Sequence, residues 1–162
     1  MEIVTAKTPF GIFSYWPSDG IGQSIAQGNF WEPFLKETFD KLTWEDTVID
    51  AGANIGWYTI RAASRGAYVY AFEPCPEVFS LLKLNVEQNG LEERVTLFPL
   101  ALYSRCESMV AEELGPTNPA NQVFVNGAVD TSQCVNSGSF ALKIGAEGVA
   151  RQFAVALDSF DL

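Results

Sequence analysis

The fold is decided by residues 47–56, which read TVIDAGANIG. The β-branched run over 47–50 is typical of a short buried strand, and the small residues and glycines after it predict a tight turn. From Ile55 onward, apolar or small side chains recur at helical spacing until Gly66, a typical helix stop. The segment therefore predicts a strand, a turn and a helix in direct succession.

The same alternation continues downstream. Residues 67–73 (AYVYAFE) predict a second strand, and residues 76–88 predict a helix that Pro76 opens. A third strand is expected over 94–103, where Pro99 limits the ladder pairing. Strands that alternate with helices are typical of a parallel sheet with right-handed crossovers, so we expect an α/β doubly wound core.

The flanking regions differ from this core. Upstream, the sequence predicts a helix over 31–42, a short strand within 10–17 and a loop over 19–28. Downstream, Asn126-Gly127 between two apolar runs predicts a hairpin, and the alternation over 152–157 predicts a further strand. We therefore expect an antiparallel hairpin excursion appended to the parallel core.

The composition narrows the function classes. Of 162 residues, ten are Lys or Arg, 20 are Asp or Glu and none is His, which gives a net charge of −10. An acidic chain repels phosphate, so we expect neither nucleic-acid nor anionic-membrane binding. The lack of histidine excludes Ser-His-Asp catalysis, histidine metal ligands and a histidine general base within this chain.

Cysteine usage predicts a reduced, cytoplasmic setting. Cys75, Cys106 and Cys134 are widely spaced and form no CxxC, so neither a disulfide framework nor a metal site is expected. The N-terminus has an acid at position 2 and no apolar region typical of a signal peptide. No apolar run approaches the roughly 18 residues that span a bilayer.

The strand–turn–helix segment also indicates a ligand. Parallel strands bind nucleotides in the crevice beyond their carboxyl ends, and the glycines let the backbone approach a ligand closely. Glu73 ends the second strand, 21 residues after Gly52, and its carboxylate can accept both hydroxyl groups of a ribose. A nucleoside-bearing cofactor is therefore expected, with a satisfied strand-end acid and a plain tight turn as the structural alternative.

The turn residues favour one class of cofactor. A dinucleotide fingerprint needs G-x-G-x-x-G, but position 54 is Asn, and the Gly-Lys-Ser/Thr of a P-loop is absent. Asp50 places a negative charge near the turn, which suits a cationic ligand better than a pyrophosphate. S-adenosylmethionine (SAM) fits, because it has a ribose, an ammonium and a sulfonium and no phosphate.

Three stretches, VIDAGANIGWYTIRAA, YAFEPCPEVFSLLKLNVEQNG and VTLFPLAL, resemble the FkbM family of class I SAM-dependent methyltransferases. The lead-in that begins at Gly28 and the V-x-LD pattern at Val155–Asp158 are also similar to that family. The resemblance covers about residues 28–162 and is strongest over 50–102. It implies a Rossmann-like fold, SAM as methyl donor, and O-methylation of a small-molecule or saccharide acceptor.

The resemblance assigns one group of residues to the amino-acid end of the cofactor. Asp50, Gly52, Asn54 and Gly56 would line the methionine moiety. Glu32 would face the amino group of the cofactor.

A second group would hold the nucleoside. Glu73 would bind the ribose, with Phe72 and Pro74 beside it, and Leu100 and Ala101 would border the adenine. No catalytic residue and no metal ligand is assigned. A hydroxyl acceptor must lose its proton, and any base in this chain would be an Asp or Glu.

The chain departs from the family pattern near its C-terminus. The family continues with a fourth parallel strand of the form I-K-I-D-V-E-G, whereas this chain ends at Asp161-Leu162. Residues 141–148 (ALKIGAEG) are superficially similar, but they precede the LD pattern and carry Gly145 in place of the acid, so we interpret the similarity as coincidental. We therefore expect one incomplete domain.

We expect this domain to have three parts: a lead-in and helix over 1–46, the cofactor-binding βαβαβ unit over 47–103 and the excursion over 104–162. An incomplete sheet would expose an edge strand, through which the chain could self-associate. Two further alternatives stay open at this point. The chain could be a truncated, non-catalytic SAM-binding remnant, or a nicotinamide-dependent oxidoreductase, which Asn54 disfavours.

Overall fold

Three parallel strands form the centre of the computed structural model, which describes residues 2–102, 107–112, 123–125, 128–130, 141–144 and 151–155. They are β3 (Thr47–Ala51), β4 (Tyr68–Phe72) and β5 (Val95–Phe98), and they pair in the order β3-β4-β5. In the register, Asp50 lies opposite Ala71, and Phe72 lies opposite Phe98. The predicted parallel α/β core with a Rossmann-like arrangement is confirmed.

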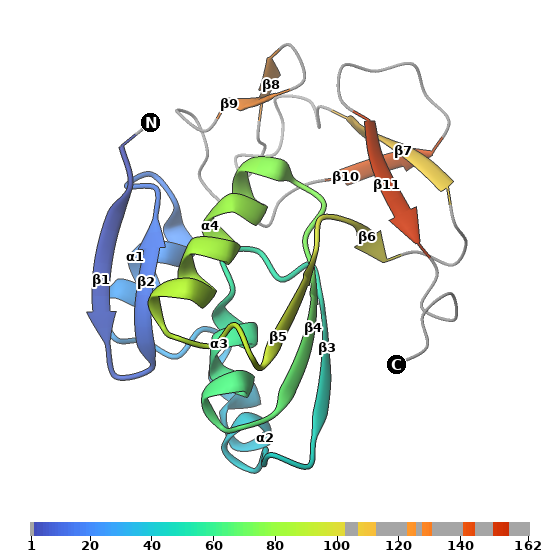
Figure 1. The fold of residues 1–162 in the computed structure, drawn as a ribbon. Coiled ribbons are helices and arrows are strands. Elements are labelled where there is room, and N and C mark those ends of the chain that lie inside the picture. Colours follow the sequence, from blue (N-terminus) through green and yellow to red (C-terminus); the bar gives the residue numbers. More distant parts are fainter. Residues whose placement is uncertain are drawn as a thin grey trace.

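Two helices make the crossovers and lie on the same side of the sheet (Figure 1). They are α3 (Trp57–Ser64) and α4 (Pro76–Gln88), and both follow the sequence prediction closely. Their apolar faces are buried against alternate residues of the strands, which share one hydrophobic cluster with them: Ala62, Ala63, Leu82, Val86, Val69, Ala71 and Val95. This packing holds the carboxyl ends of the strands, and hence the turn after β3, in a fixed place.

The N-terminal region contains more regular structure than the sequence predicts. The short strand expected within 10–17 is β2 (Gly11–Tyr15), and it pairs antiparallel with β1 (Val4–Thr8). The loop expected over 19–28 is wrong, because this segment forms helix α1 (Gly20–Ala26). The Asp19 carboxylate caps the helix by accepting the N–H groups of Ile21 and Gly22, and burial of its apolar side stabilises it despite its polar composition.

Two elements are shorter than the sequence predicts or are divided into two parts. The helix expected over 31–42 is a 3₁₀ turn, η1 (Pro33–Leu35), followed by one short helix, α2 (Lys36–Asp40). The strand expected over 94–103 ends at Phe98 and resumes as β6 (Ala101–Leu102). The division falls at Pro99, which has no N–H to donate to a neighbouring strand.

The excursion forms a second, mostly antiparallel sheet. It contains β7 (Glu107–Glu112), β10 (Ala141–Ile144) and β11 (Arg151–Val155) in the order β10-β7-β11-β6, with β11 parallel to β6. The predicted hairpin is confirmed as β8 (Val123–Val125) and β9 (Ala128–Asp130). Strand β10 pairs antiparallel with β7, which agrees with our interpretation of residues 141–148.

The predicted strand over 152–157 is confirmed as far as Val155, and residues 156–162 with the LD pattern lie outside the described residues. The predicted bounds of the three parts stay a prediction. Among the described residues, no helix has both the length and the apolar character needed to cross a membrane.

Candidate functional site

The turn between β3 and α3 is held in an unusual backbone conformation. Gly52, Asn54 and Gly56 have φ values of 81°, 54° and 93°, in the region that L-residues with a Cβ rarely adopt. The N–H groups of Gly52 and Ala53 both donate to the carbonyl of Phe72, at 2.9 Å each. The end of β4 therefore fixes the start of the turn.

Glu73 connects the turn to the next loop. Glu73 is 4% exposed, and its carboxylate accepts the N–H of Asn54 at 3.0 Å and the N–H of Cys75 at 2.9 Å. Burial raises the pKa of Glu73 to about 7, although these two hydrogen bonds oppose the shift. Each oxygen holds one backbone N–H and has a further lone pair for a ligand hydroxyl.

The raised pKa of Glu73 predicts a pH-dependent stability. The unfolded chain loses this proton near the ordinary value of 4.5, whereas the folded chain keeps it until about pH 7. Unfolding therefore releases a proton between these values, and the free energy of unfolding should fall by about 3 kcal/mol as pH rises from 4.5 to 7. Urea titrations across this range check the slope, which Glu73→Gln should flatten and exposed Glu93→Gln should not. An unaltered slope in Glu73→Gln would contradict the assignment.

Asp50 ties β3 to α3. Asp50 is 8% exposed, its carboxylate accepts a hydrogen bond from the Thr59 hydroxyl at 2.6 Å, and burial raises its pKa. This is the geometry of the satisfied strand-end acid, the structural alternative to a ligand contact. A direct contact of Asp50 with the cofactor stays a prediction.

A cavity of about 110 Å³ opens beside the turn. It is lined by residues 52–55, by Trp57 and Tyr58 at the start of α3, and by Trp31 and Ile21. Gly52 and Asn54 are thus in its wall, and Gly56 directly precedes α3. Their contacts with the methionine moiety of a cofactor stay predictions. The sequence gives no sign that Ile21 and Trp31 form the remaining wall, because only the docking of the N-terminal region on α3 brings them there.

Glu32 lies next to this cavity through a side-chain contact. The Tyr58 hydroxyl donates a hydrogen bond to the Glu32 carboxylate, and the Tyr58 ring stacks on Phe39 with centroids 5.0 Å apart. Burial and the neighbouring carboxylates raise the pKa of Tyr58, so this phenol stays protonated. Glu32 itself has a φ of 53°, and such strained residues cluster at ligand sites.

The remaining predicted contacts lie away from the cavity lining. Pro74 directly follows Glu73, and Leu100 and Ala101 lie at the break between β5 and β6. The Phe72 ring at the end of β4 stacks on the Phe98 ring at the end of β5, with centroids 4.6 Å apart. Their contacts with an adenine or ribose stay predictions.

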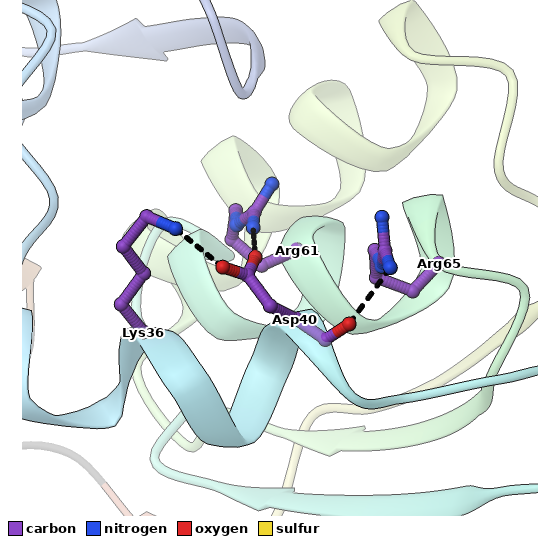
Figure 2. Close-up of polar contacts among 4 residues, drawn as sticks. All are labelled: Lys36, Asp40, Arg61 and Arg65. Atoms are coloured by element: carbon purple, nitrogen blue, oxygen red, sulfur yellow. Dashed lines mark hydrogen bonds and ion pairs between the residues drawn. The ribbon is translucent and has the colours of Figure 1, made fainter.

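The positive charges close to α3 are engaged elsewhere. Figure 2 shows Asp40 of α2 between Lys36 and Arg61, while Arg65 donates to the Asp40 carbonyl at 2.7 Å. The Lys36 hydrogen bond is the main cause that lowers the pKa of Asp40. Arg61 also lies over the Phe10 ring, 4.7 Å from its centroid. These contacts hold α2 against α3. They also engage the guanidinium groups of Arg61 and Arg65 away from the 52–56 turn.

The carboxylates around the turn have a different environment. Within the described part of the chain, Glu32, Asp50 and Glu73 form no ion pair with Lys or Arg. Across all the residues that the structure describes, no group of three or more His, Cys, Asp or Glu side chains is placed to hold a metal ion. A cavity flanked by acids without a cationic partner favours a positively charged ligand.

Two proteins that are named as methyltransferases share sequence with this chain. A tRNA (guanine(37)-N(1))-methyltransferase of Danio rerio is 32% identical over 71 residues, which are 41% of this chain and 15% of that protein. A "probable cobalt-precorrin-6B C(15)-methyltransferase (decarboxylating)" of Methanothermobacter thermautotrophicus is 36% identical over 52 residues, 32% of this chain and 27% of that protein. This chain is therefore similar in sequence to methyltransferases over part of its length. It spans less than a third of the length of either relative.

No protein-family model matches this chain. A solved SAM-dependent methyltransferase from Agrobacterium tumefaciens aligns with 61% of this chain and 32% of its own, at 16% identity and a TM-score of 0.45. The fold assignment rests on the strand pairing and crossovers described above. The FkbM family itself stays a prediction.

The expected partners need correction. The net charge of −10 led us to exclude nucleic acids and to expect a small-molecule or saccharide acceptor, yet one relative is a tRNA methyltransferase. The reasoning failed because net charge is a sum over the whole surface, whereas a substrate meets the potential of one face. We therefore retain neither the exclusion of nucleic acid nor the expected acceptor class.

Proposed function

We propose that this chain binds SAM in the cavity beside the 52–56 turn and forms the cofactor-binding part of a methyltransferase of the FkbM type. The observation that carries the proposal is the space at Gly52. This residue lines the cavity, and a Cβ added to it would meet no atom within 4 Å. Backbone that approaches an open pocket at the end of a parallel strand is suited to holding a cofactor closely.

The acids around the turn support SAM among the nucleoside cofactors. Glu73 would accept the ribose hydroxyls with the lone pairs that Asn54 and Cys75 leave free. Glu32, held by Tyr58 at the cavity, would accept the ammonium group of the cofactor. Asp50 adds negative charge behind the turn. None of these acids has a Lys or Arg ion-pair partner within the described residues, which favours a cation.

When bound, SAM supplies a methyl group activated by its sulfonium. The turn and the walls from α1, Trp31 and α3 would hold the amino-acid end of the cofactor, and most of the catalytic effect would come from holding methyl and acceptor in line. We assign no general base.

Gly52→Ala tests the proposal at the open space. The new methyl group would enter the ligand volume, so SAM affinity measured by calorimetry should fall by about tenfold or more, since overpacking costs about 1–3 kcal/mol. Strain from the φ of 81° should lower the free energy of unfolding by only about 1–2 kcal/mol.

Gly90→Ala is the matched control. Gly90 also has a positive φ, 66°, and open space at its Cβ position, but it lies at the far end of α4. It should show a similar loss of stability and unchanged SAM affinity. Equal SAM affinities of the two variants would contradict the placement of the site. If the folded wild-type chain bound NAD and not SAM, the oxidoreductase alternative would replace the proposed function.

The acceptor is best identified by transfer of labelled methyl from SAM. The assay has two arms, unmodified tRNA and a panel of small hydroxyl compounds, because the O-methylation implied by the FkbM resemblance is untested. Methyl transfer in one arm would name the acceptor class. SAM binding with no transfer in both would support the non-catalytic alternative.

A further inference from the structure

Asn85 on α4 and Asn89, which directly follows the last residue of α4, bind the backbone of strand β2. The Asn85 amide accepts the N–H of Ser14 at 2.7 Å and donates to the Ser14 carbonyl at 3.0 Å. One helical turn later, the Asn89 amide accepts the N–H of Ile12 at 2.8 Å and donates to the Ile12 carbonyl at 2.7 Å. The four residues from Asn85 to Asn89 rise about 6 Å along the helix, and the two residues from Ile12 to Ser14 span about 6.7 Å along the strand. Because these lengths are similar, the two amides bind alternate residues of β2, as the backbone of a partner strand would.

Asn85 has a further contact that Asn89 lacks. Its amide nitrogen donates to the carbonyl of Ile55 at 2.7 Å, and Ile55 lies in the cavity wall. Asn85 is 0% exposed, so its hydrogen bonds are shielded from water. One buried side chain thus joins the N-terminal hairpin, helix α4 and the candidate cofactor turn.

The turn needs such support. It contains Asn54 at a φ of 54° between two glycines with positive φ, and strained backbone of this kind persists only when the surrounding structure fixes it. Without the Asn85 amide, the carbonyl of Ile55 and both backbone groups of Ser14 would lose a buried partner.

We infer that Asn85 is a positioning residue, which holds the 52–56 turn in its ligand-binding conformation and couples docking of the β1–β2 hairpin to cofactor affinity. The inference rests on the proposed function for the identity of the ligand. It does not depend on that function for the coupling itself, because the hydrogen bonds exist without a ligand.

Asn89→Ala is a matched control for Asn85→Ala, since both remove a side-chain clamp on β2 and only one removes the contact with the turn. In the ligand-free chain, Asn85→Ala should speed amide hydrogen exchange at Gly56 by about tenfold or more, the loss expected for a buried hydrogen-bond partner. Asn89→Ala should speed exchange at Ile12 and leave Gly56 unchanged. By calorimetry, SAM affinity should fall about tenfold in Asn85→Ala and stay within about twofold in Asn89→Ala.

Asn85→Asp replaces the alanine variant if that variant does not fold, because it keeps the side-chain shape and the acceptor for the Ser14 N–H and loses the donor to the Ile55 and Ser14 carbonyls. Equal exchange at Gly56 in the Asn85 and Asn89 variants would overturn the inference, as would normal exchange and normal affinity in a folded Asn85 variant. If the wild-type chain binds no SAM while the exchange pattern appears as expected, the proposed function fails and the positioning role stands.

Discussion

Glu73→Ala should reduce SAM affinity at least about 100-fold. The substitution removes the proposed acceptor of the ribose hydroxyls, and hydrogen bonds to a charged group contribute about 1.5–3 kcal/mol each. It also leaves the N–H groups of Asn54 and Cys75 without their carboxylate partner, so the turn keeps its two hydrogen bonds to Phe72 and loses the one to Glu73. Isothermal titration with SAM at about pH 8, where the Glu73 carboxyl with its pKa of about 7 is ionised, measures the change.

Two further variants make this result specific. Glu93→Ala removes an exposed acid of the same type and should leave the affinity unchanged. Glu73→Gln keeps one acceptor oxygen and should lie between the alanine variant and the wild type. If a folded Glu73→Ala chain, shown by its thermal transition, bound SAM as tightly as the wild type, the ribose assignment would be wrong.

Gly56→Ala should be the most destabilising single-methyl addition in the turn. Gly56 precedes α3 with a φ of 93°, and a Cβ there would lie 2.7 Å from the Leu82 Cδ1 atom. The backbone strain costs about 1–2 kcal/mol and overpacking about 1–3 kcal/mol, so the free energy of unfolding should fall by about 3 kcal/mol. Urea denaturation measures this loss.

A double-mutant cycle separates the two causes. Leu82 is fully buried, and Leu82→Ala alone should cost about 2–5 kcal/mol through the cavity it creates. In the double variant the new methyl group has room, so the combined loss should be smaller than the sum of the single losses by about 1 kcal/mol or more. Strict additivity would show that the loss of stability in Gly56→Ala comes from backbone strain alone.

The central part of the fold could be predicted because its signals are local. The TVIDAGANIG segment contains the strand, the turn glycines and the helix start within ten residues, and Pro76 marks the start of α4. The hairpin at Asn126-Gly127 follows from turn chemistry alone. In each case the residues that determine the element lie next to one another in the sequence.

The rest of the site depends on contacts between distant segments. The cavity wall from Ile21 and Trp31 exists because the N-terminal region packs on α3, and no periodicity in the sequence encodes that docking. Helix α1 was missed because polar and glycine residues obscure the apolar pair Ile21 and Ile25, four residues apart. The helix signal that was present is Asp19, a strong N-cap residue.

The contacts between β2 and α4 also order the events of folding. Ile12 pairs with a side chain 77 residues later, and Ser14 with one 71 residues later. Closing loops of this length costs entropy before the contacts form, so a hairpin that is synthesised first gains its docking surface only after α4 exists. The support that Asn85 gives to the cofactor turn is consequently completed late, when the N-terminal hairpin meets α4.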